Sequence, residues 1–196
     1  MKRMSLWLLI FYIVGWCAAL ALISRFWLKR SVWEHPGEVL LYMAFLAMFG
    51  PLGEIIVGTL YTAVVGYPLL QYQLYPIHHG YTSLYAPFIW AIGGLQIWVM
   101  SPLTSRIKDR VRRFTVMAID ILAVEILINT LFLLIAGQMI FYYIPSDLGH
   151  LSSLQTLPFY FIASLVIVRS LQLMRPHKGF AVAACLLVCT VVVYLT

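Results

Sequence analysis

Long apolar runs, separated by short polar connections, occupy most of the chain. They span residues 4–23, 38–65, 81–100, 114–140, 157–173 and 180–196. A helix that crosses a bilayer needs about 20 predominantly apolar residues, and lipid offers no partner to the open backbone groups of a sheet edge. The pattern therefore predicts an all-α fold: a polytopic integral membrane helix bundle with about six transmembrane helices, forming one membrane domain over residues 1–196.

The composition indicates a lipid environment and excludes several classes of protein. Hydrophobic residues make up 63% of the 196 positions and charged residues 10%, against roughly 25% charged residues in average soluble domains. There are too few charged side chains to cover a water-facing surface, which excludes a soluble enzyme and an ordinary nucleic-acid-binding protein. We expect membrane lipids as partners and no nucleic acid, and we leave open a protein partner or a homo-oligomer.

Basic side chains gather in three of the polar connections and predict the orientation of the helices. These connections follow the first, third and fifth apolar runs and contain Arg25, Lys29, Arg30, Arg106, Lys108, Arg110, Arg112, Arg113, Arg175 and Lys178. The connections around residues 78–79 and 147–150 contain neither Lys nor Arg. By the positive-inside rule the basic connections face the cytoplasm and both termini face outward, which predicts a multi-pass protein of the plasma (inner) membrane. Tyrosines, among them Tyr72 and Tyr143, lie near those ends of the apolar runs that are predicted to face outward, which is typical of an aromatic belt.

The second and fourth apolar runs share a pattern that predicts an internal duplication. Six similar positions lie 71 residues apart in the two runs: Glu54 and Glu125, Ile55 and Ile126, Thr59 and Thr130, Leu60 and Leu131, Tyr61 and Phe132, and Gly66 and Gly137. Matched Ile, Leu and Gly positions are common in apolar sequence, whereas matched intramembrane glutamates are rare. The predicted repeats cover residues 37–105 and 106–174 and run parallel. They are flanked by a first helix with its basic loop (1–36) and by a C-terminal helix (175–196).

Glu54 and Glu125 are the main candidates for a functional site. An acidic residue inside a span costs about 2.5–3.5 kcal/mol on insertion scales, so it indicates function by default. Gly50 and Gly58 share a helix face with Glu54, which would let a neighbouring helix or a ligand approach the carboxylate closely. Two carboxylates near one axis would favour a shared proton or a bound cation. The alternative is that each glutamate is neutral and hydrogen-bonded across a helix interface.

Other polar residues of the repeats are candidates for the same substrate or ion site. Asn129 shares a helix face with Glu125, and the duplicated segments add Thr59, Thr130 and Tyr61. Any of these side chains can donate or accept a hydrogen bond at a central polar site.

Asp120 is expected to have a structural role instead. It lies about 140° round the helix from Glu125 and at a level similar to that of Arg169, which predicts an ion pair between Asp120 and Arg169. No nucleotide-binding, metalloprotease, hydrolase or haem-attachment motif occurs, and His78 and His79 lack further ligands at metal spacing. We therefore predict neither a metal nor a cofactor.

Four motifs carry a resemblance to a known family. They are a Gly-x-x-x-Glu (Gly50, Glu54), a Thr-Ser block (Gly80, Thr82, Ser83, Tyr85, Ala86, Phe88, Ile89, Trp90), a second intramembrane glutamate (Glu125) and a late segment (Gly149, Leu154, Pro158, Phe159). Over roughly residues 49–174 the chain thereby resembles the type IV ABC-transporter (CmpB-like) membrane proteins, which include the transmembrane protein 229 group. It departs from that family at Val124, where members usually have Trp, and at Leu154 or Gln155, where they often have another Glu. The resemblance implies a polytopic membrane protein; the transporter label of the family is a name rather than a mechanism, and it identifies no substrate.

Three functions are open for such a chain. We favour a transport or permease-type protein with a central intramembrane acidic site, which predicts a cavity open to one side at Glu54 and Glu125. The second is a non-catalytic membrane subunit that anchors a partner complex, which predicts a dry core. The third is a lipid-phase enzyme that uses an intramembrane carboxylate as general acid or base, which predicts a lateral opening to lipid beside a glutamate.

Overall fold

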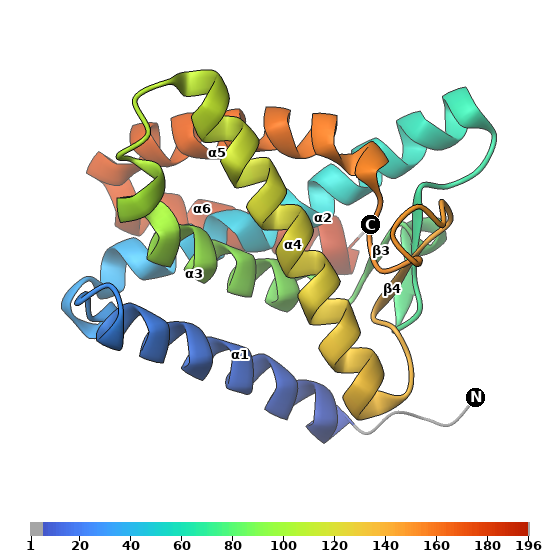
Figure 1. Cartoon of the computed structure of the whole chain (residues 1–196), viewed down its shortest axis with the longest axis horizontal. Helices are drawn as coiled ribbons and strands as arrows, with labels where there is room; N and C mark the ends of the chain where they lie inside the picture. Colours follow the sequence, from blue (N-terminus) through green and yellow to red (C-terminus); the bar gives the residue numbers. More distant parts are fainter. Residues whose placement is uncertain (1–5, 196) are drawn as a thin grey trace.

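The computed structural model describes residues 6–195, within which the chain forms six α-helices (Figure 1). Their bounds are α1 (Leu6–Phe26), α2 (Pro36–Val65), α3 (Ala86–Thr104), α4 (Arg110–Ala136), α5 (Leu157–Met174) and α6 (Lys178–Thr190), and a π-helical turn (Val191–Leu195) extends α6. One-turn 3-10 helices lie at Val32–Glu34, His78–Gly80, Leu154–Thr156 and Arg175–His177. The predicted all-α character is confirmed, and residues 1–5 and 196, which include the start of the first predicted run and the end of the last, lie outside the described part.

Five helical stretches are long and apolar enough to cross a membrane. Four of them correspond to α1, α2, α3 and α4, and the fifth, Leu154–Leu195, contains α5 and α6 in succession. The sequence pattern predicts six crossings, whereas length and composition support five stretches. The difference lies at α6, since its 13 residues form a helix of only about 20 Å at 1.5 Å per residue.

Particular residues set the helix ends that the apolar runs leave undefined. α2 and α4 both stop at a glycine in the left-handed conformation, Gly66 (φ 88°) and Gly137 (φ 69°), a conformation that glycine adopts without strain. α4 starts four residues earlier than predicted because the Asp109 side chain accepts a hydrogen bond from the Arg112 N–H. α3 starts at residue 86 rather than at 81, because Thr82–Ser83 form a strand.

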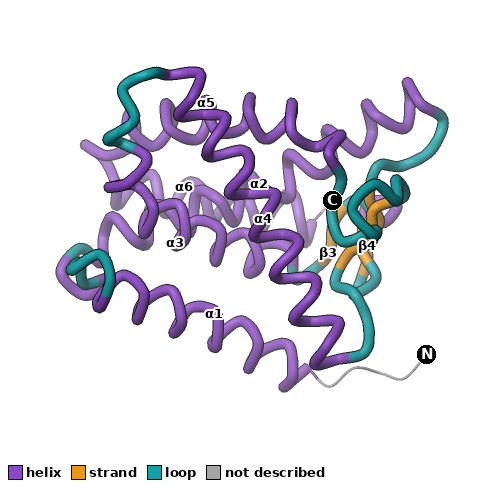
Figure 2. The backbone as a smooth tube through the Cα atoms, viewed as in Figure 1, coloured by secondary structure: helices purple, strands orange, loops and turns teal. Residues whose placement is uncertain are grey.

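Two small antiparallel sheets lie at one end of the bundle (Figure 2). β1 (Leu70–Tyr72) follows α2 and pairs with β4 (Phe141–Tyr143), which follows α4. β2 (Pro76–Ile77) pairs with β3 (Thr82–Ser83) within the connection between α2 and α3. Strands of two or three residues are too short to give a periodic pattern, and none is predicted from the sequence.

α2 is the central helix and packs most extensively against α3 and α6. α3 approaches it through Gly94, where an added Cβ would lie 2.4 Å from the carbonyl oxygen of Tyr42. Leu41, Leu46 and Trp98 are completely buried in the core formed around this contact. α5 packs mainly against α4 and touches α2 little, so α2 and α5 are separated along much of their length.

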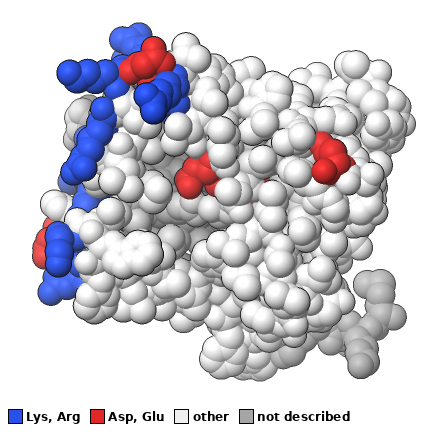
Figure 3. Space-filling view, in the orientation of Figure 1, with Lys and Arg blue, Asp and Glu red and all other residues white. Residues whose placement is uncertain are grey.

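The three basic connections meet at the other end of the bundle, and Figure 3 shows their Lys and Arg side chains along one edge of the molecule. Glu38 at the start of α2 joins two of the connections, because its carboxylate lies 3.4 Å from Arg30 Nη2 and 3.5 Å from Arg175 Nη2. The Arg30 guanidinium also lies over the Trp98 ring, 3.7 Å from its centroid. The strands and the basic connections thus mark opposite ends of the helices (Figures 1 and 2).

The close approach of α2 and α3 gives a first testable prediction. Gly94→Ala is expected to lower the free energy of unfolding by about 1–3 kcal/mol, because the added methyl group meets a backbone carbonyl that cannot move aside easily. Gly15→Ala on α1 is the matched control, since nothing lies within 4 Å of a Cβ added there. Unfolding of both variants in detergent by heat measures the difference, and equal melting temperatures would contradict the packing described.

Candidate functional site

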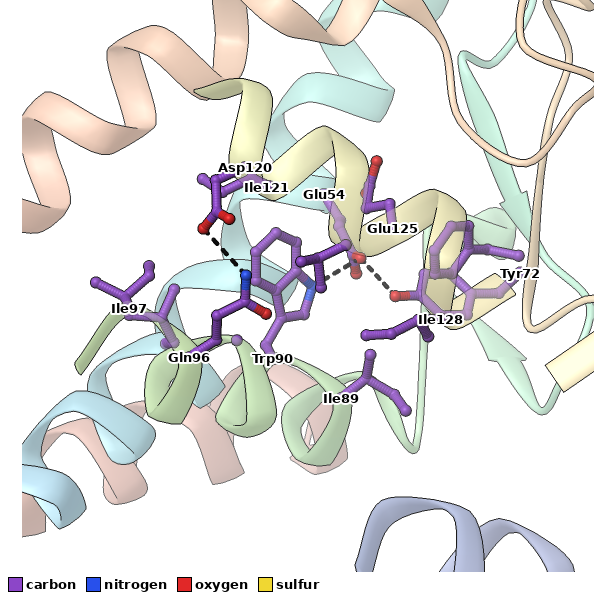
Figure 4. Close-up of a pocket in the computed structure, with 14 residues that line it drawn as sticks. Glu54, Tyr72, Ile89, Trp90, Gln96, Ile97, Asp120, Ile121, Glu125 and Ile128 are labelled. Carbon is purple, nitrogen blue, oxygen red and sulfur yellow. Dashed lines mark hydrogen bonds between the residues drawn. The ribbon is translucent and has the colours of Figure 1, made fainter. Parts of the chain in front are cut away.

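Glu54, near the middle of α2, holds its carboxylate between three hydrogen-bond donors. Tyr72 Oη donates to Oε1 over 2.5 Å and Trp90 Nε1 donates to the same oxygen over 2.8 Å (Figure 4). Thr82 Oγ1 donates to Oε2 over 2.6 Å. The donors come in chain order from β1, β3 and α3, so the loop after α2 folds back to supply two of them.

Glu125, near the middle of α4, is held in the same way. Tyr143 Oη donates to Oε1 over 2.9 Å, and Ser152 Oγ donates to Oε2 over 2.7 Å. Tyr160 Oη also donates to Oε1. These donors come in chain order from β4, from the loop that follows it and from α5. Each glutamate is therefore bound by a strand tyrosine, a hydroxyl from the connection between two helices and an aromatic side chain of the next helix.

The pairing of β1 with β4 relates the two groups of donors. The register pairs Gln71 with Tyr142, Leu70 with Tyr143, and Tyr72 with Phe141. Each β1 residue corresponds to the β4 residue that lies 71 positions later in the chain. Gln71 therefore pairs with its own counterpart, Tyr142, whereas Leu70 pairs with the counterpart of Tyr72, and Tyr72 with the counterpart of Leu70. Glu54 and Glu125 are separated by the same 71 residues.

Gly50 allows Trp90 to reach the Glu54 carboxylate. The Trp90 ring lies so close to α2 that a Cβ added at Gly50 would be 2.0 Å from its Cγ. Farther along the same face, a Cβ added at Gly58 would be 2.7 Å from the ring of Tyr81. The predicted close approach to the Glu54 face is confirmed, and it is made by two aromatic rings.

A cavity of about 380 Å³ lies beside the glutamates and is lined mainly by α2 and α5. Ile56 on α2 and Ile162 on α5 line it and are 54% and 61% exposed, so the cavity opens at the surface between these helices. Glu54 and Glu125 both border it, and neither side chain is fully buried. The volume falls within the range of about 300–1,000 Å³ that is typical of ligand pockets.

A smaller cavity of about 60 Å³ lies between α2, α3 and α4. The wall common to both cavities is formed by Glu54, Trp90, Ile121 and Glu125. At one end of the small cavity, Gln96 Nε2 donates a hydrogen bond to Asp120 Oδ2 over 3.0 Å (Figure 4). The space has room for several water molecules, each of which needs about 10–15 Å³ by this measure and two to four polar partners.

The two carboxylates have no ion-pair partner in the part of the chain that the structure describes. The ion pairs there involve Glu34 and Glu38, both at the basic end. Burial, together with the nearby glutamates, holds the pKa of the strand phenols Tyr72 and Tyr143 well above the usual value, so both phenols stay protonated and donate. Hydroxyl and indole donors stabilise a carboxylate without cancelling its charge.

The two oxygens of each carboxylate are used unequally. Oε1 of Glu54 and of Glu125 accepts two hydrogen bonds, whereas Oε2 accepts one. A carboxylate has about four lone-pair sites, so each glutamate can still accept a proton or a cationic group.

Four of the predicted candidates lie away from the cavities. Asn129 is completely buried and ties α4 to β4: its amide donates to Phe141 O and accepts from the Ile140 N–H. Thr59 is exposed, and neither Thr59 nor Thr130 lines either cavity. Tyr61 donates instead to Gln155 Oε1, joining the end of α2 to the 3-10 turn before α5. Of the six predicted site residues, the structure brings Glu54 and Glu125 together at the cavities.

The predicted ion pair between Asp120 and Arg169 is wrong. Within residues 6–195 no ion pair joins them, and Asp120 accepts its hydrogen bond from Gln96 instead. Arg169 is an exposed residue on α5, whereas Asp120 faces α3 and the small cavity. A similar level along two helices therefore does not imply a contact between two side chains, because the direction in which each side chain points around its helix decides the contact.

The sequence pattern does not identify the strand tyrosines as hydrogen-bond donors. The positions of Tyr72 and Tyr143 are typical of an aromatic belt, yet both are buried and both donate to a glutamate. One signal pointed to them, because they lie 71 residues apart as the glutamates do. Gln96, Trp90 and Tyr160 had no such signal.

Comparison of the chain with protein-family models, with curated proteins and with solved structures gives no match. The resemblance to the CmpB-like membrane proteins therefore stays a prediction from the motif residues.

Removal of a single donor should destabilise the fold. Tyr72→Phe and Tyr143→Phe are each expected to lower the free energy of unfolding by about 1–3 kcal/mol, because a partly buried carboxylate loses a hydrogen bond. Tyr142→Phe is the matched control, since its ring stacks on His150 and that contact survives the change. The measurement is thermal unfolding in detergent, and a loss confined to the Tyr142 variant would contradict the assignment.

Proposed function

We propose that this chain is a multi-pass membrane protein of transport or permease type, with Glu54 and Glu125 as its central intramembrane site. The observation that carries the proposal is the cavity of about 380 Å³ that borders both carboxylates. A purely structural subunit gains nothing from such a space, because the atoms that line it lose packing contacts. Polar groups near the middle of spanning helices are typical of transporter binding sites.

The arrangement of the helices also favours a passage. Glu54 and Glu125 border the large cavity on one side and the small cavity on the other. α5 packs on α4 and touches α2 little, so a tilt of α5 together with α4 would change access to the glutamates while breaking few contacts with α2. Alternating access requires one element that moves against a fixed site.

We also propose that α6 is a sixth crossing. Lys178 at its start lies beside Gly37 at the basic end, and Tyr194 in the π-helical extension donates to Leu84 O at the strand end. The helix and its extension together would be about 27 Å long, close to the hydrocarbon thickness of roughly 30 Å. Six crossings place both termini on the strand side.

A parallel duplication of residues 37–105 and 106–174 is part of the same proposal. It is supported by the 71-residue spacing of Glu54 and Glu125, by the same order of donors around each glutamate, and by the register of β1 with β4. Two repeats related in this way would place the glutamates around one axis along the membrane normal.

The proposed orientation, with the basic end in the cytoplasm, can be tested by labelling. In a variant with its three native cysteines replaced by Ala, Ser146→Cys at the strand end should react with a membrane-impermeant maleimide in intact cells. Ser105→Cys at the basic end should react only after permeabilisation. Both positions are exposed, so access depends on the membrane, and the reverse pattern would contradict the orientation.

Transport itself can be tested in proteoliposomes on a solid-supported membrane. The probes are K⁺, tetraethylammonium, benzoate and glycine betaine, each applied as a concentration jump. We expect a protein-dependent current for at least one probe and a loss of at least about tenfold in the Glu54→Gln/Glu125→Gln double variant, because the central charge is removed. Glu34→Gln, which changes an exposed carboxylate at the basic end, should leave the current unchanged. Currents that persist in the double variant would contradict the central site.

The lateral position of the cavity mouth also favours a second candidate, the lipid-phase enzyme. A lipid entering between α2 and α5 would bring its polar group to a glutamate that can act as general acid or base. Mass spectrometry of lipids incubated with the protein separates the two functions: an enzyme changes the lipid, and a transporter leaves it intact.

A further inference from the structure

We propose that the large cavity binds an amphiphilic organic cation, with a quaternary or tertiary ammonium head and an apolar body, that enters sideways from the lipid between α2 and α5. The inference rests on the proposed function and names the ligand class of the same site. It is carried by three features of the cavity wall: its charge, its aromatic rings and the position of its mouth.

The charge of the wall selects a cation. Two carboxylates, Glu54 and Glu125, line the cavity, and its lining contains no Lys or Arg. Both glutamates border the same space, and their donors are neutral hydroxyl and indole groups. A positive group in the cavity would be attracted by both carboxylates, whereas an anion would be repelled by them.

The aromatic rings select an ammonium head that is poor in hydrogen-bond donors. Five aromatic side chains line the cavity: Phe49, Trp90, Tyr143, Phe159 and Tyr160. A cation within about 6 Å of a ring centroid is attracted by the ring face, and groups of such rings recognise quaternary ammonium ions. Rings beside paired carboxylates suit an alkylated ammonium better than a hydrated metal ion, which needs several oxygen ligands.

The remaining wall accommodates an apolar body. Leu52, Val57 and Val166 line it together with Ile56 and Ile162 at the mouth. Since the last two residues belong to spanning helices and are more than half exposed, the mouth faces the acyl chains rather than the water. A ligand that is dissolved in lipid therefore reaches the glutamates without crossing either end of the bundle.

Gly53 provides a variant that fills the cavity and leaves both carboxylates in place. It lines the cavity, and nothing lies within 4 Å of a Cβ added there, so Gly53→Leu should extend into the open space. Gly15→Leu on α1 is the matched control, because a Cβ added there also meets nothing and Gly15 does not line the cavity. Ala163→Phe, on the opposite wall in α5, is a second filling variant if Gly53→Leu fails to fold.

The test is equilibrium binding of radiolabelled octyltrimethylammonium to the full chain in lipid nanodiscs, with empty nanodiscs subtracted. We expect saturable binding at least about tenfold tighter than that of the uncharged analogue in which carbon replaces nitrogen, and no binding of octyl sulfate. The filling variant should lose saturable binding, the Gly15 variant should keep it, and Glu54→Gln/Glu125→Gln should weaken it at least about tenfold. Equal binding of the uncharged analogue, or full binding by both filling variants, would overturn the proposal.

The binding experiment and the transport assay can fail independently of each other. If another probe carries current while octyltrimethylammonium does not bind, transport holds and the ligand class is wrong. If octyltrimethylammonium binds as expected while no probe carries current, the binding site is right and the transport function is wrong.

Discussion

The constraint on which the rest of the structure depends is the partial burial of two carboxylates among apolar helices, with no ion-pair partner in the described part of the chain. A polar group removed from water costs several kcal/mol unless it is hydrogen-bonded, and a charge costs more. Apolar helices offer few donors, so the loops after α2 and α4 supply them. Tyr72 and Tyr143 reach the glutamates because their strands fold back over the bundle, and pairing the strands satisfies backbone groups brought there.

The same constraint shapes the packing of the helices. Trp90 can donate to Glu54 only because α3 lies against α2, and that contact requires glycine at positions 50 and 94. Tyr160 donates to Glu125 from α5, which accordingly packs on α4. Each glutamate is thus hydrogen-bonded to the helix that follows its own helix in the chain. The space left between the pair α2–α3 and the pair α4–α5 is the large cavity. The cavity between α2 and α5 is therefore a consequence of where the hydrogen-bond donors of the two carboxylates lie.

The helices and the two glutamates could be predicted because each leaves a local mark in the sequence: a run of about 20 apolar residues, and an acidic residue within it. The donors could not be predicted in this way. An inward tyrosine at a loop, such as Tyr143, has the same local sequence context as one that anchors to the interface. Asn129 and Asp120 were misassigned for a related reason, since their partners, Phe141 O and Gln96, depend on where loops and neighbouring helices lie.

The position of the glutamates between two unlike cavities gives the site a further property. The large cavity is mainly apolar and opens between α2 and α5, whereas the small one is bordered by Asp120 and Gln96 and has room for water. The cation that we propose for the large cavity and a proton would each neutralise the same carboxylates. By thermodynamic linkage, each would then weaken the binding of the other by the same factor. At a site shared in this way, uptake of the proposed cation would therefore be accompanied by release of a proton.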